Sequence, residues 1–554
     1  MRKTFAIFGL LLILSIPSIK SLLPRGGYTS HDLTHHIVRQ IDMDKLLAEG
    51  QFPPRWSGDL GSGFGYPLFL FNYPSPYIFG EVFHKAGLNF VESVKAVMLV
   101  SMLISVIGMY LFLDSLFPNQ KMAAFLGAIF YLYAPIRFID IYVSGSVGTA
   151  LAMGVLPFIF WLIVKEYKGS KSAVPIGGIL IALLITSHNV TALMFAPVFI
   201  VFSLILVYLA ENRLRLLRNL GFMAAIGLGL SAFFWIPAIV EKKYIIYDQV
   251  MKNSWINQFP TVAQLVHSPW GYGLAHPGVS EPGGMSFQIG LTQILVMAIL
   301  PFVLIIFRKK KEMVVWGIFG EFVFLVAIFL MQKISTPFWV HLPLLYLVQY
   351  PFRFLAVDIF AASIAATLII RYLPFKKVLF VILLTLVIYS NRNHLNINQR
   401  FDPGDDYYAA LRNQESSYDE DLPSMAFLPT SPSPGKLQIL AGDGNVHVTE
   451  NKSIVVKAAI DVSTKATLRF NQFYFPGWVL KVNNQPLQFS TSELEGSHYL
   501  PVFNLNSGSY NFEADFLDTP DRKIADIVSM MTLSVISGII LLSLWPKIFG
   551  QEKG

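Results

Sequence analysis

The sequence predicts an all-α polytopic membrane protein with about twelve transmembrane helices and a small β-sandwich near its C-terminal end. The 554 residues are 54% hydrophobic and only 14% charged, whereas a soluble domain carries about a quarter charged residues. Apolar runs of about twenty residues recur along the chain, and each is long enough to cross the hydrocarbon of a bilayer as a helix. After residue 436, short alternating runs separated by Gly, Asn, Ser and Pro are typical of antiparallel strands.

The first apolar run, MRKTFAIFGLLLILSIPSIK, has a basic start and an apolar core. This is also the pattern of a signal peptide. No small-x-small cleavage site follows the core, so we interpret the run as an uncleaved first helix, with cleavage as the alternative. Further transmembrane helices are expected at 92–116, 121–137, 147–166, 173–188, 190–209, 220–240, 287–307, 312–331, 352–371, 376–390 and 524–546.

The Lys and Arg residues predict the orientation of these helices. They gather in alternate loops, namely KEYKGSK (165–171), ENRLRLLRN (211–219), RKKK (308–311) and RYLPFKK (371–377). Basic loops stay in the cytoplasm. We therefore expect both termini on the cytoplasmic side and the long polar stretches on the outer side of the membrane.

The same pattern predicts the domain organisation. Residues 1–390 form the transmembrane domain, with outer loops 25–91, 241–286 and 332–351. An acidic, Pro- and Ser-rich linker or lid follows at 391–435. The β-sandwich is expected at 436–520, before the final transmembrane helix.

Composition and missing motifs exclude several functions. The net charge of +7 comes from the short loop clusters, so it does not indicate nucleic-acid binding. The absence of Cys excludes disulfides and thiolate chemistry. The chain has no Walker loop, GxGxxG after a strand, GxSxG elbow or zinc signature. It also has no sizeable cytoplasmic domain for a nucleotide-sugar, so a sugar donor should be lipid-linked.

Asp32 is the leading catalytic candidate. It lies just beyond the outer end of the first helix, where a carboxylate is close to lipid headgroups and still reaches water. Such a group suits a general base that deprotonates a sugar hydroxyl. The alternative is that Asp32, or Ser30, only caps the helix DLTHHIVRQIDMDKLL.

Three histidines adjoin this carboxylate. His31 and His35 are four residues apart, which is the spacing of a helical metal pair, and His36 follows. The alternative is a polar cleft lined by histidines without a metal, because the glutamate of HExxH is missing. A divalent cation would fit this region, but no complete ligand pattern indicates one.

The following stretch, FPPRWSGDLGSGFGYPLFLFNYPSPY, combines Gly-rich turns with aromatic residues. Trp56 and its aromatic neighbours could stack on sugar rings, and Arg55 and Asp59 could bond hydroxyls or phosphate. The alternative is an aromatic belt that anchors the segment at the membrane interface.

Five charged or polar side chains are expected at the outer ends of the helices: Arg137, Asp140, His188, Glu241 and Arg353. Ionisable groups at this depth are costly and therefore suggest function. Arg is suited to gripping phosphate with its fork of donors. The alternative for each residue is a side chain that reaches the interface from a helix end.

These segments resemble a known group of membrane proteins. An acidic residue in the first outer loop, followed by an aromatic loop, resembles the glycosyltransferase C (GT-C) superfamily. The chain is more closely similar to the bacterial "6-pyruvoyl-tetrahydropterin synthase-related" and YfhO-like membrane proteins. The matching pieces are HDLTHH, GFGYPLFLFNYPSPY, LSAFFWIPAIVE, MSFQIGLTQ, LLYLVQYPFRFL and FYFPGWVLKVNNQPL. The group's label does not imply pterin chemistry, since no zinc site of that kind is present.

The resemblance implies a polyprenyl-phosphate-sugar-dependent glycosyltransferase with a GT-C-like fold. Asp32 stands at the position of the superfamily's base, and Asp140 could take the role of the second acidic residue that many relatives carry between the third and fourth helices. We expect inverting transfer of a sugar to an envelope glycan, lipid or protein acceptor. Arg353, with Arg137 and His188, would hold the lipid phosphate. The alternatives are a transporter or flippase for a lipid-linked precursor, and a catalytically inactive envelope scaffold.

Overall fold

The fold is described from a computed structural model, which describes residues 2–279, 281–411, 419–424, 426, 431–491 and 499–549. The chain divides into two compact units. The first comprises residues 1–33, 86–228 and 251–402, and the second comprises 34–85, 229–250 and 403–554. Part of the expected 391–435 linker lies outside the described residues.

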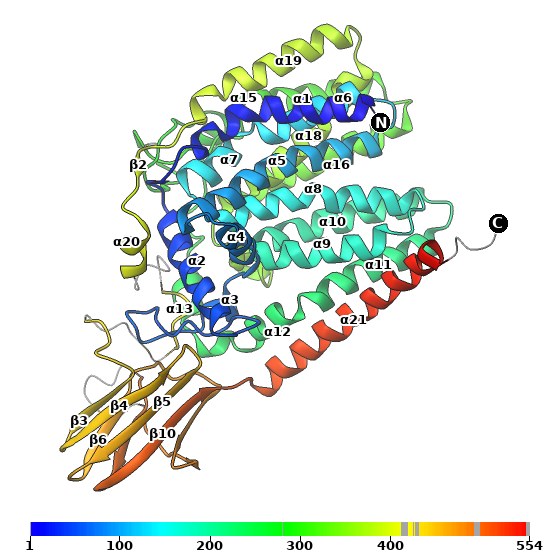
Figure 1. The fold of residues 1–554 in the computed structure, drawn as a ribbon. Helices are drawn as coiled ribbons and strands as arrows, with labels where there is room; N and C mark the ends of the chain where they lie inside the picture. Colours follow the sequence, from blue (N-terminus) through cyan, green and yellow to red (C-terminus); the bar gives the residue numbers. More distant parts are fainter. Residues whose placement is uncertain are drawn as a thin grey trace. The chain divides into compact units, whose positions relative to one another are not determined.

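The first unit is a bundle of long helices that run roughly side by side (Figure 1). They are α1 (Arg2–Ile19), α5 (Phe90–Leu116), α6 (Lys121–Leu132), α8 (Val147–Tyr167), α9 (Ala173–Ser187), α10 (Asn189–Leu209), most of α11 (Arg213–Leu230), α15 (Leu291–Ile306), α16 (Lys311–Leu330), α18 (Leu355–Tyr372) and α19 (Lys376–Ser390). Helix α18 lies at the centre, because 94% of its apolar stretch is buried inside the protein. Phe360 of α18 stacks on Phe160 of α8, with ring centroids 4.3 Å apart.

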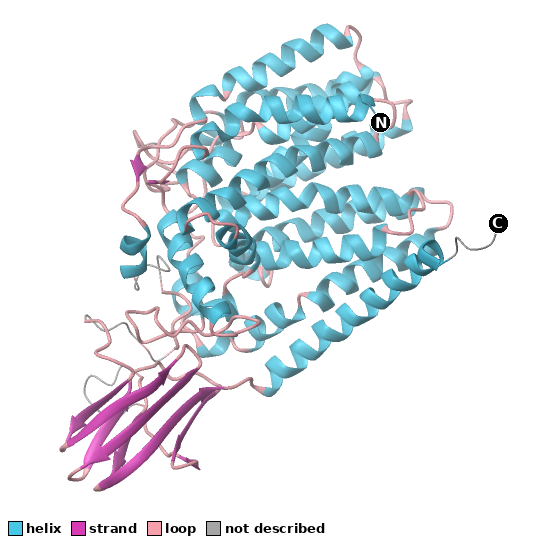
Figure 2. Cartoon of the chain, viewed as in Figure 1, coloured by secondary structure: helices cyan, strands magenta, loops and turns pink. Residues whose placement is uncertain are grey.

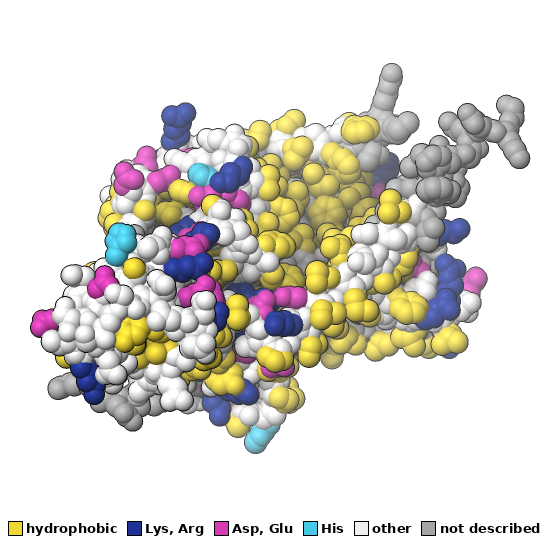
Figure 3. All heavy atoms as spheres, turned by 60° about the horizontal axis from the view of Figure 1, so that its bottom comes forward, with side chains coloured by type: hydrophobic (Ala, Val, Ile, Leu, Met, Phe, Trp, Pro, Cys, Tyr) yellow, Lys and Arg dark blue, Asp and Glu magenta, His cyan; other side chains and the backbone are white. Residues whose placement is uncertain are grey.

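The sides of the helices carry the apolar surface that a bilayer requires. Side chains such as Ile200, Phe302 and Leu325 are more than half exposed, and Figure 3 shows hydrophobic side chains covering the helix surfaces. In water such surface would be unstable, whereas in lipid it costs nothing. The first unit is therefore a multi-span membrane region.

By length and composition, six described helices can cross a membrane, or eight if each of two bent pairs forms one span. This measure falls short of the expected twelve spans. All twelve expected segments do contain a helix, but α9, α15 and α19 have only 15, 16 and 15 residues. A full crossing needs about 20 residues.

Short elements lie between the long helices of the first unit. They are η1 (Lys20–Leu22), β1 (Gly27–Tyr28), α7 (Pro135–Phe138), the π-helix η2 (Ile139–Val143), α14 (Val262–Val266), η4 (Lys333–Ser335), α17 (Thr336–His341), η5 (Leu345–Val348), η6 (Pro351–Phe354), η7 (Arg392–His394) and β2 (Arg400–Phe401). Strands β1 and β2 pair antiparallel, with Gly27 opposite Phe401. The first polar loop is therefore tied to the chain that follows α19.

The second unit joins helices to a C-terminal β-sheet region. Its helices are α2 (Leu33–Ala48, from Thr34 on), α3 (Leu68–Phe71), α4 (Ser75–Lys85), α12 (Ala232–Val240), η3 (Lys242–Tyr244), α20 (Asp405–Ala410) and α21 (Pro520–Phe549), and α13 (Tyr247–Met251) starts in it. Helix α21 packs along α12, and the Ser529 hydroxyl donates to the Gly229 carbonyl at 3.0 Å.

The β-region consists of two antiparallel sheets (Figure 2). One has the order β4-β5-β10-β7-β8 and the other β3-β6-β9. The strands are β3 (Leu437–Ala441), β4 (Gly444–Asn451), β5 (Val455–Val462), β6 (Ala466–Phe470), β7 (Trp478–Val482), β8 (Gln485–Pro486), β9 (Val502–Leu505) and β10 (Gly508–Phe516). Alternate residues of β5 are buried, as a half-buried strand requires. Phe512 of the larger sheet stacks on Phe503 of the smaller at 5.6 Å, so aromatic side chains fill the space between the sheets.

Candidate functional site

A bend in the third apolar segment positions the loop that contains Asp32. The axes of Lys121–Leu132 and Pro135–Val143 differ by 49°, because Pro135 cannot donate a helical hydrogen bond. The bend continues into the π-helix η2, and carbonyls of its last residue and of the residue after it accept bonds from the loop. His31 N–H donates to the Val143 carbonyl at 3.0 Å, and Asp32 N–H donates to the Ser144 carbonyl at 2.7 Å. Single π-helical turns are frequent at functional sites.

A glycine makes this contact possible. Gly145 has a φ of +73°, and a Cβ at this position would lie 2.5 Å from the Ser30 hydroxyl oxygen. A larger residue would push the loop away from the turn at 144–146. The Asp32 backbone is therefore held tightly, whatever its side chain binds.

Asp32 is partly buried. The capping role is taken by Ser30, whose hydroxyl accepts the Leu33 N–H at 3.1 Å. Within the part of the chain that the structure describes, the Asp32 carboxylate has no hydrogen bond or ion pair. A fixed backbone with an uncommitted carboxylate suits a group that acts on a ligand. The catalytic role of Asp32 stays a prediction.

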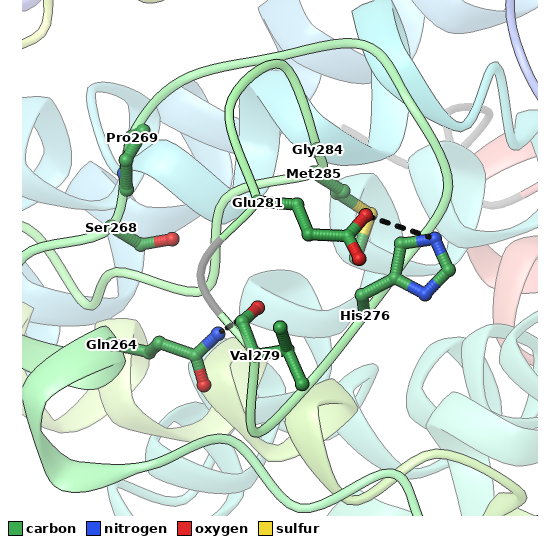
Figure 4. Close-up of a pocket in the computed structure, with 8 residues that line it drawn as sticks. All are labelled: Gln264, Ser268, Pro269, His276, Val279, Glu281, Gly284 and Met285. Carbon is green, nitrogen blue, oxygen red and sulfur yellow. Dashed lines mark hydrogen bonds and ion pairs between the residues drawn. The ribbon is translucent and has the colours of Figure 1, made fainter.

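His31 is held by the loop that precedes α15. Its Nε2 donates to the Gly273 carbonyl at 3.0 Å. The same loop encloses a small hollow lined by Gln264, Ser268, Pro269, His276, Val279, Glu281, Gly284 and Met285 (Figure 4). The Gln264 amide donates to the Val279 carbonyl at 3.1 Å, so a hydrogen bond joins two residues that line the hollow.

Three predicted site residues come together in the first unit. Arg353, on η6, interacts electrostatically with Asp140 of η2 and with His188, between α9 and α10. Asp140 and Arg353 are partly buried, whereas His188 is buried and its Nδ1 accepts the Thr191 N–H at 3.1 Å. The Asp140 carbonyl accepts the Ser146 N–H at 2.8 Å, at the turn that holds Asp32. We call Asp140, His188 and Arg353 the charged cluster.

Arg137 lies deeper than expected. Its side chain has no exposed surface, and its Nη2 lies 3.3 Å from the Ser105 hydroxyl. Its guanidinium lies over the Tyr131 ring and interacts electrostatically with Asp140. Direct contact with a ligand would require the helix bend to open. We therefore assign Arg137 a supporting charge beside Asp140.

His394, on η7 of the first unit, is a buried histidine. The His394 ring stacks on Trp270 at 4.2 Å, and its Nδ1 lies 3.2 Å from the Asn391 side-chain oxygen. Burial lowers the pKa of the His394 imidazole from 6.5 to about 4. The folded protein therefore keeps this ring neutral under conditions in which the unfolded chain protonates it.

We expect acid to destabilise the protein through His394. The pKa of His394 is lower in the folded protein than in the unfolded chain. The neutral ring therefore makes its full contribution to the free energy of unfolding above pH 6.5, and this contribution is lost as the pH falls from 6.5 towards 4. The loss reaches about 3 kcal/mol. His394→Gln should flatten the pH dependence of the thermal midpoint in detergent, whereas His447→Gln, at an exposed position of β4, should not. Identical profiles for wild type and His394→Gln would rule this explanation out.

The remaining predicted residues lie in the second unit, where Arg55 and Trp56 contact other side chains of the protein. Arg55 forms ion pairs with Asp518 and, at 2.7 Å, with Asp526. The Trp56 indole is fully buried and packs on Trp478 at 5.5 Å. Its Nε1–H donates to the Gln472 side chain at 3.0 Å. Sugar stacking on Trp56 would require this core to open.

Asp59, Glu241 and His35 also lie in the second unit. Asp59 forms ion pairs with Lys45 and, at 3.6 Å, with Lys436. Glu241 is buried and forms an ion pair with Arg522 at 2.8 Å. His35 lies in the first turn of α2. Among the described residues no group of three or more His, Asp or Glu side chains could hold a metal ion.

Sequence patterns gave no reason to select Gln349, whose side chain contacts Arg353. The Gly at 145 and the Pro at 135 were the available signals for the bend, because both residue types mark departures from regular helix.

The fold and its apolar surface define a multi-span helical membrane protein with a C-terminal β-sheet region. Residues 72–397, more than half of the chain, match the family described as "6-pyruvoyl-tetrahydropterin synthase related domain; membrane protein". The chain belongs to this family.

Comparisons with individual proteins give more distant matches. The chain is 24% identical over 256 residues to an uncharacterised protein of Lactococcus lactis subsp. cremoris (strain MG1363), covering 45% of this chain and 41% of that one. In structure it is distantly similar to the Archaeoglobus fulgidus oligosaccharyltransferase (TM-score 0.46, 12% identity, 76% of this chain and 61% of that chain). It is also distantly similar to the arabinofuranosyltransferase AftD from Mycobacteria (TM-score 0.42, 14% identity, 71% and 26%). The chain thus spans less than two thirds of each relative.

Proposed function

We propose that the protein is a membrane glycosyltransferase that moves a sugar from a polyprenyl-phosphate donor to an acceptor hydroxyl of an envelope glycan, lipid or protein. The observation that carries the proposal is that the Asp32 loop and Asp140 of the charged cluster are bonded to the same turn: the Ser144 carbonyl accepts the Asp32 N–H, and the Asp140 carbonyl accepts the Ser146 N–H. The Asp32 carboxylate itself has no hydrogen bond or ion pair among the described residues. A base and an anion-holding group are the two parts that such a transfer requires. The proposed transfer requires no metal ion.

In the proposed reaction the Asp32 carboxylate accepts the proton of the acceptor hydroxyl. The hydroxyl oxygen attacks the anomeric carbon, and the bond from that carbon to the phosphate oxygen breaks on the opposite face, which inverts the configuration. The electron pair leaves with the polyprenyl phosphate. Arg353 and His188 stabilise the charge on this leaving group. The charges of Asp140 and Arg137 offset each other beside them.

We also propose that this site faces the outside of a prokaryotic plasma membrane. The site residues lie at one end of α8 and α18, and the basic loops at 165–171 and 371–377 follow the other ends. Basic loops face the cytoplasm. The lipid-linked donor and the envelope acceptor would both be within reach on the outer side, along with the surrounding membrane lipids.

Binding of a lipid phosphate tests the proposal. Purified protein should bind farnesyl phosphate, and Arg353→Ala should weaken that binding by about tenfold to a hundredfold, because a charge-assisted bond to the phosphate is lost. Arg392→Ala is the matched control, since Arg392 lies over the Tyr389 ring outside the charged cluster. Titration of each variant with farnesyl phosphate measures the effect. Equal affinity in wild type and Arg353→Ala would contradict the assignment.

One observation favours a flippase for a lipid-linked precursor as the second candidate. Asp358, in the first turn of α18, is fully buried and neither carboxylate oxygen has a hydrogen-bond partner in the described residues. Transporters place such groups along their pathways. Movement of a fluorescent polyprenyl phosphate across proteoliposomes, without any protein-dependent glycan, would favour this candidate.

A further inference from the structure

The three residues before η6 form a strained turn. Gln349 has φ +64° and ψ −49°, and the Tyr350 N–H donates to the Val348 carbonyl at 2.7 Å. This is a γ-turn of the positive-φ type, which is rare and strained. A side chain at positive φ is unusual outside Gly, Asn and Asp. Strain of this kind persists where the surrounding structure or the function requires it.

The turn holds one side of the Arg353 guanidinium. The Val348 carbonyl oxygen and the Gln349 Oε1 each accept a bond from the Arg353 Nη1 at 2.9 Å. The Tyr350 ring lies 4.8 Å from the guanidinium carbon. Three consecutive residues therefore fix the position and the plane of this cation.

The other side of the guanidinium is uncommitted. Within the described ranges, Nε and Nη2 of Arg353 have no hydrogen-bond partner, and the residue is only partly buried. Nε and Nη2 form the edge of an Arg that binds two oxygens of one anion with parallel bonds. The two hydrogen bonds from Nη1 therefore leave the Nε–Nη2 edge available to bind a phosphate group.

We propose that Gln349 is a positioning residue that turns the Nε–Nη2 edge of Arg353 toward the phosphate group of a lipid phosphate. This inference rests on the proposed function and adds a specific recognition geometry to it. Asn would be one methylene too short to reach Nη1. Glu would reach it but would place a negative charge beside the cation that binds the anion. Gly would fit the backbone best and would remove the contact, so the strained Gln is explained by the contact that it makes.

The substitution Gln349→Gly separates positioning from folding. Gly adopts positive φ without strain, so the thermal midpoint should stay equal or rise. Affinity for farnesyl phosphate should nevertheless fall about tenfold, because Arg353 loses one of its two clamping oxygens. Gln349→Glu should bind still more weakly. Gln332→Ala should match the wild type, because the Gln332 amide donates to the Pro260 and Met331 carbonyls and not to Arg353.

Three probes show which part of the ligand is affected. Titration with farnesyl phosphate, inorganic phosphate and farnesol should show weaker binding of both phosphates by Gln349→Gly and unchanged binding of farnesol. If Arg353→Ala weakens phosphate binding and Gln349→Gly does not, the positioning role is wrong and the proposed function stands. If the wild type binds farnesyl phosphate no better than farnesol, the proposed function itself fails. Equal loss for all three probes would overturn the positioning role.

Discussion

Asp32→Asn should abolish turnover while leaving lipid-phosphate binding intact. Asn keeps the size and polarity of the side chain, but it cannot accept the proton of an acceptor hydroxyl. A general base contributes about a hundredfold to ten-thousandfold to a rate, so we expect a loss of at least about a hundredfold. Because the Asp32 backbone is held by the Ser144 carbonyl, the substitution should not disturb the loop.

The measurement uses membranes of a deletion strain, which contain the natural donor and acceptor. Mass spectrometry follows the protein-dependent glycan after the purified variant is added in detergent. Farnesyl phosphate binding, measured in parallel, should be the same for wild type and Asp32→Asn. Asp406→Asn, at an exposed position of α20, is the matched control and should retain full turnover. A rate for Asp32→Asn within about twofold of wild type would remove the general base from the account.

Glu241→Ala should cost about 3–5 kcal/mol of stability, because it breaks a buried ion pair of the second unit. Glu241 and Arg522 are both buried, and the Arg522 Nη2 lies 2.8 Å from the Glu241 carboxylate. The Thr519 hydroxyl donates to the other carboxylate oxygen at 2.8 Å. Removing the carboxylate leaves a buried guanidinium without its counter-charge, and that loss exceeds the net value of the pair.

Two further variants separate charge from packing at this pair. Lys242→Ala removes the neighbouring, more exposed pair with Asp248 and should cost less than about 1 kcal/mol. The double variant Glu241→Gln/Arg522→Met should recover most of the loss, because neither side chain then carries an unpaired charge. Chemical unfolding in detergent measures all four proteins. A double variant as unstable as Glu241→Ala would show that shape, and not charge, dominates at this position.

The helical body was predictable because its signal is strong and local. Long apolar runs and basic loops identify membrane helices without knowledge of their neighbours. The number of complete spans was less predictable. Helices α9, α15 and α19 are apolar but short, and sequence length alone did not reveal where each helix ends.

The roles of individual polar residues depended on contacts that are distant in sequence. We predicted ligand binding for Arg55 and Glu241 because each charged residue lies next to an apolar segment in the sequence. Their partners, Asp518, Asp526 and Arg522, lie more than 250 residues further along the chain. No spacing pattern reports a pairing over that separation, so ion pairs and ligand-binding charges look alike in the sequence.

Local sequence was more informative about where Asp32, Asp140 and Arg353 lie, while their roles stay predictions. Each follows or begins an apolar helix, which places it at a helix end. What could not be foreseen was the π-helix that brings the Ser144 carbonyl to Asp32, and the strained backbone at Gln349. Such conformations are imposed by the surrounding structure against local preference.

The central proposal is that Asp32 and the charged cluster together transfer a sugar from a lipid phosphate. Its most direct test is mass spectrometry of the envelope glycans and lipid-linked sugars of a deletion strain that carries the wild-type gene, Asp32→Asn or an empty vector. We predict that wild type restores a sugar that the empty strain lacks, and that Asp32→Asn leaves it missing while the lipid-linked sugar accumulates. Full restoration by Asp32→Asn, expressed at the wild-type level, would contradict the proposal.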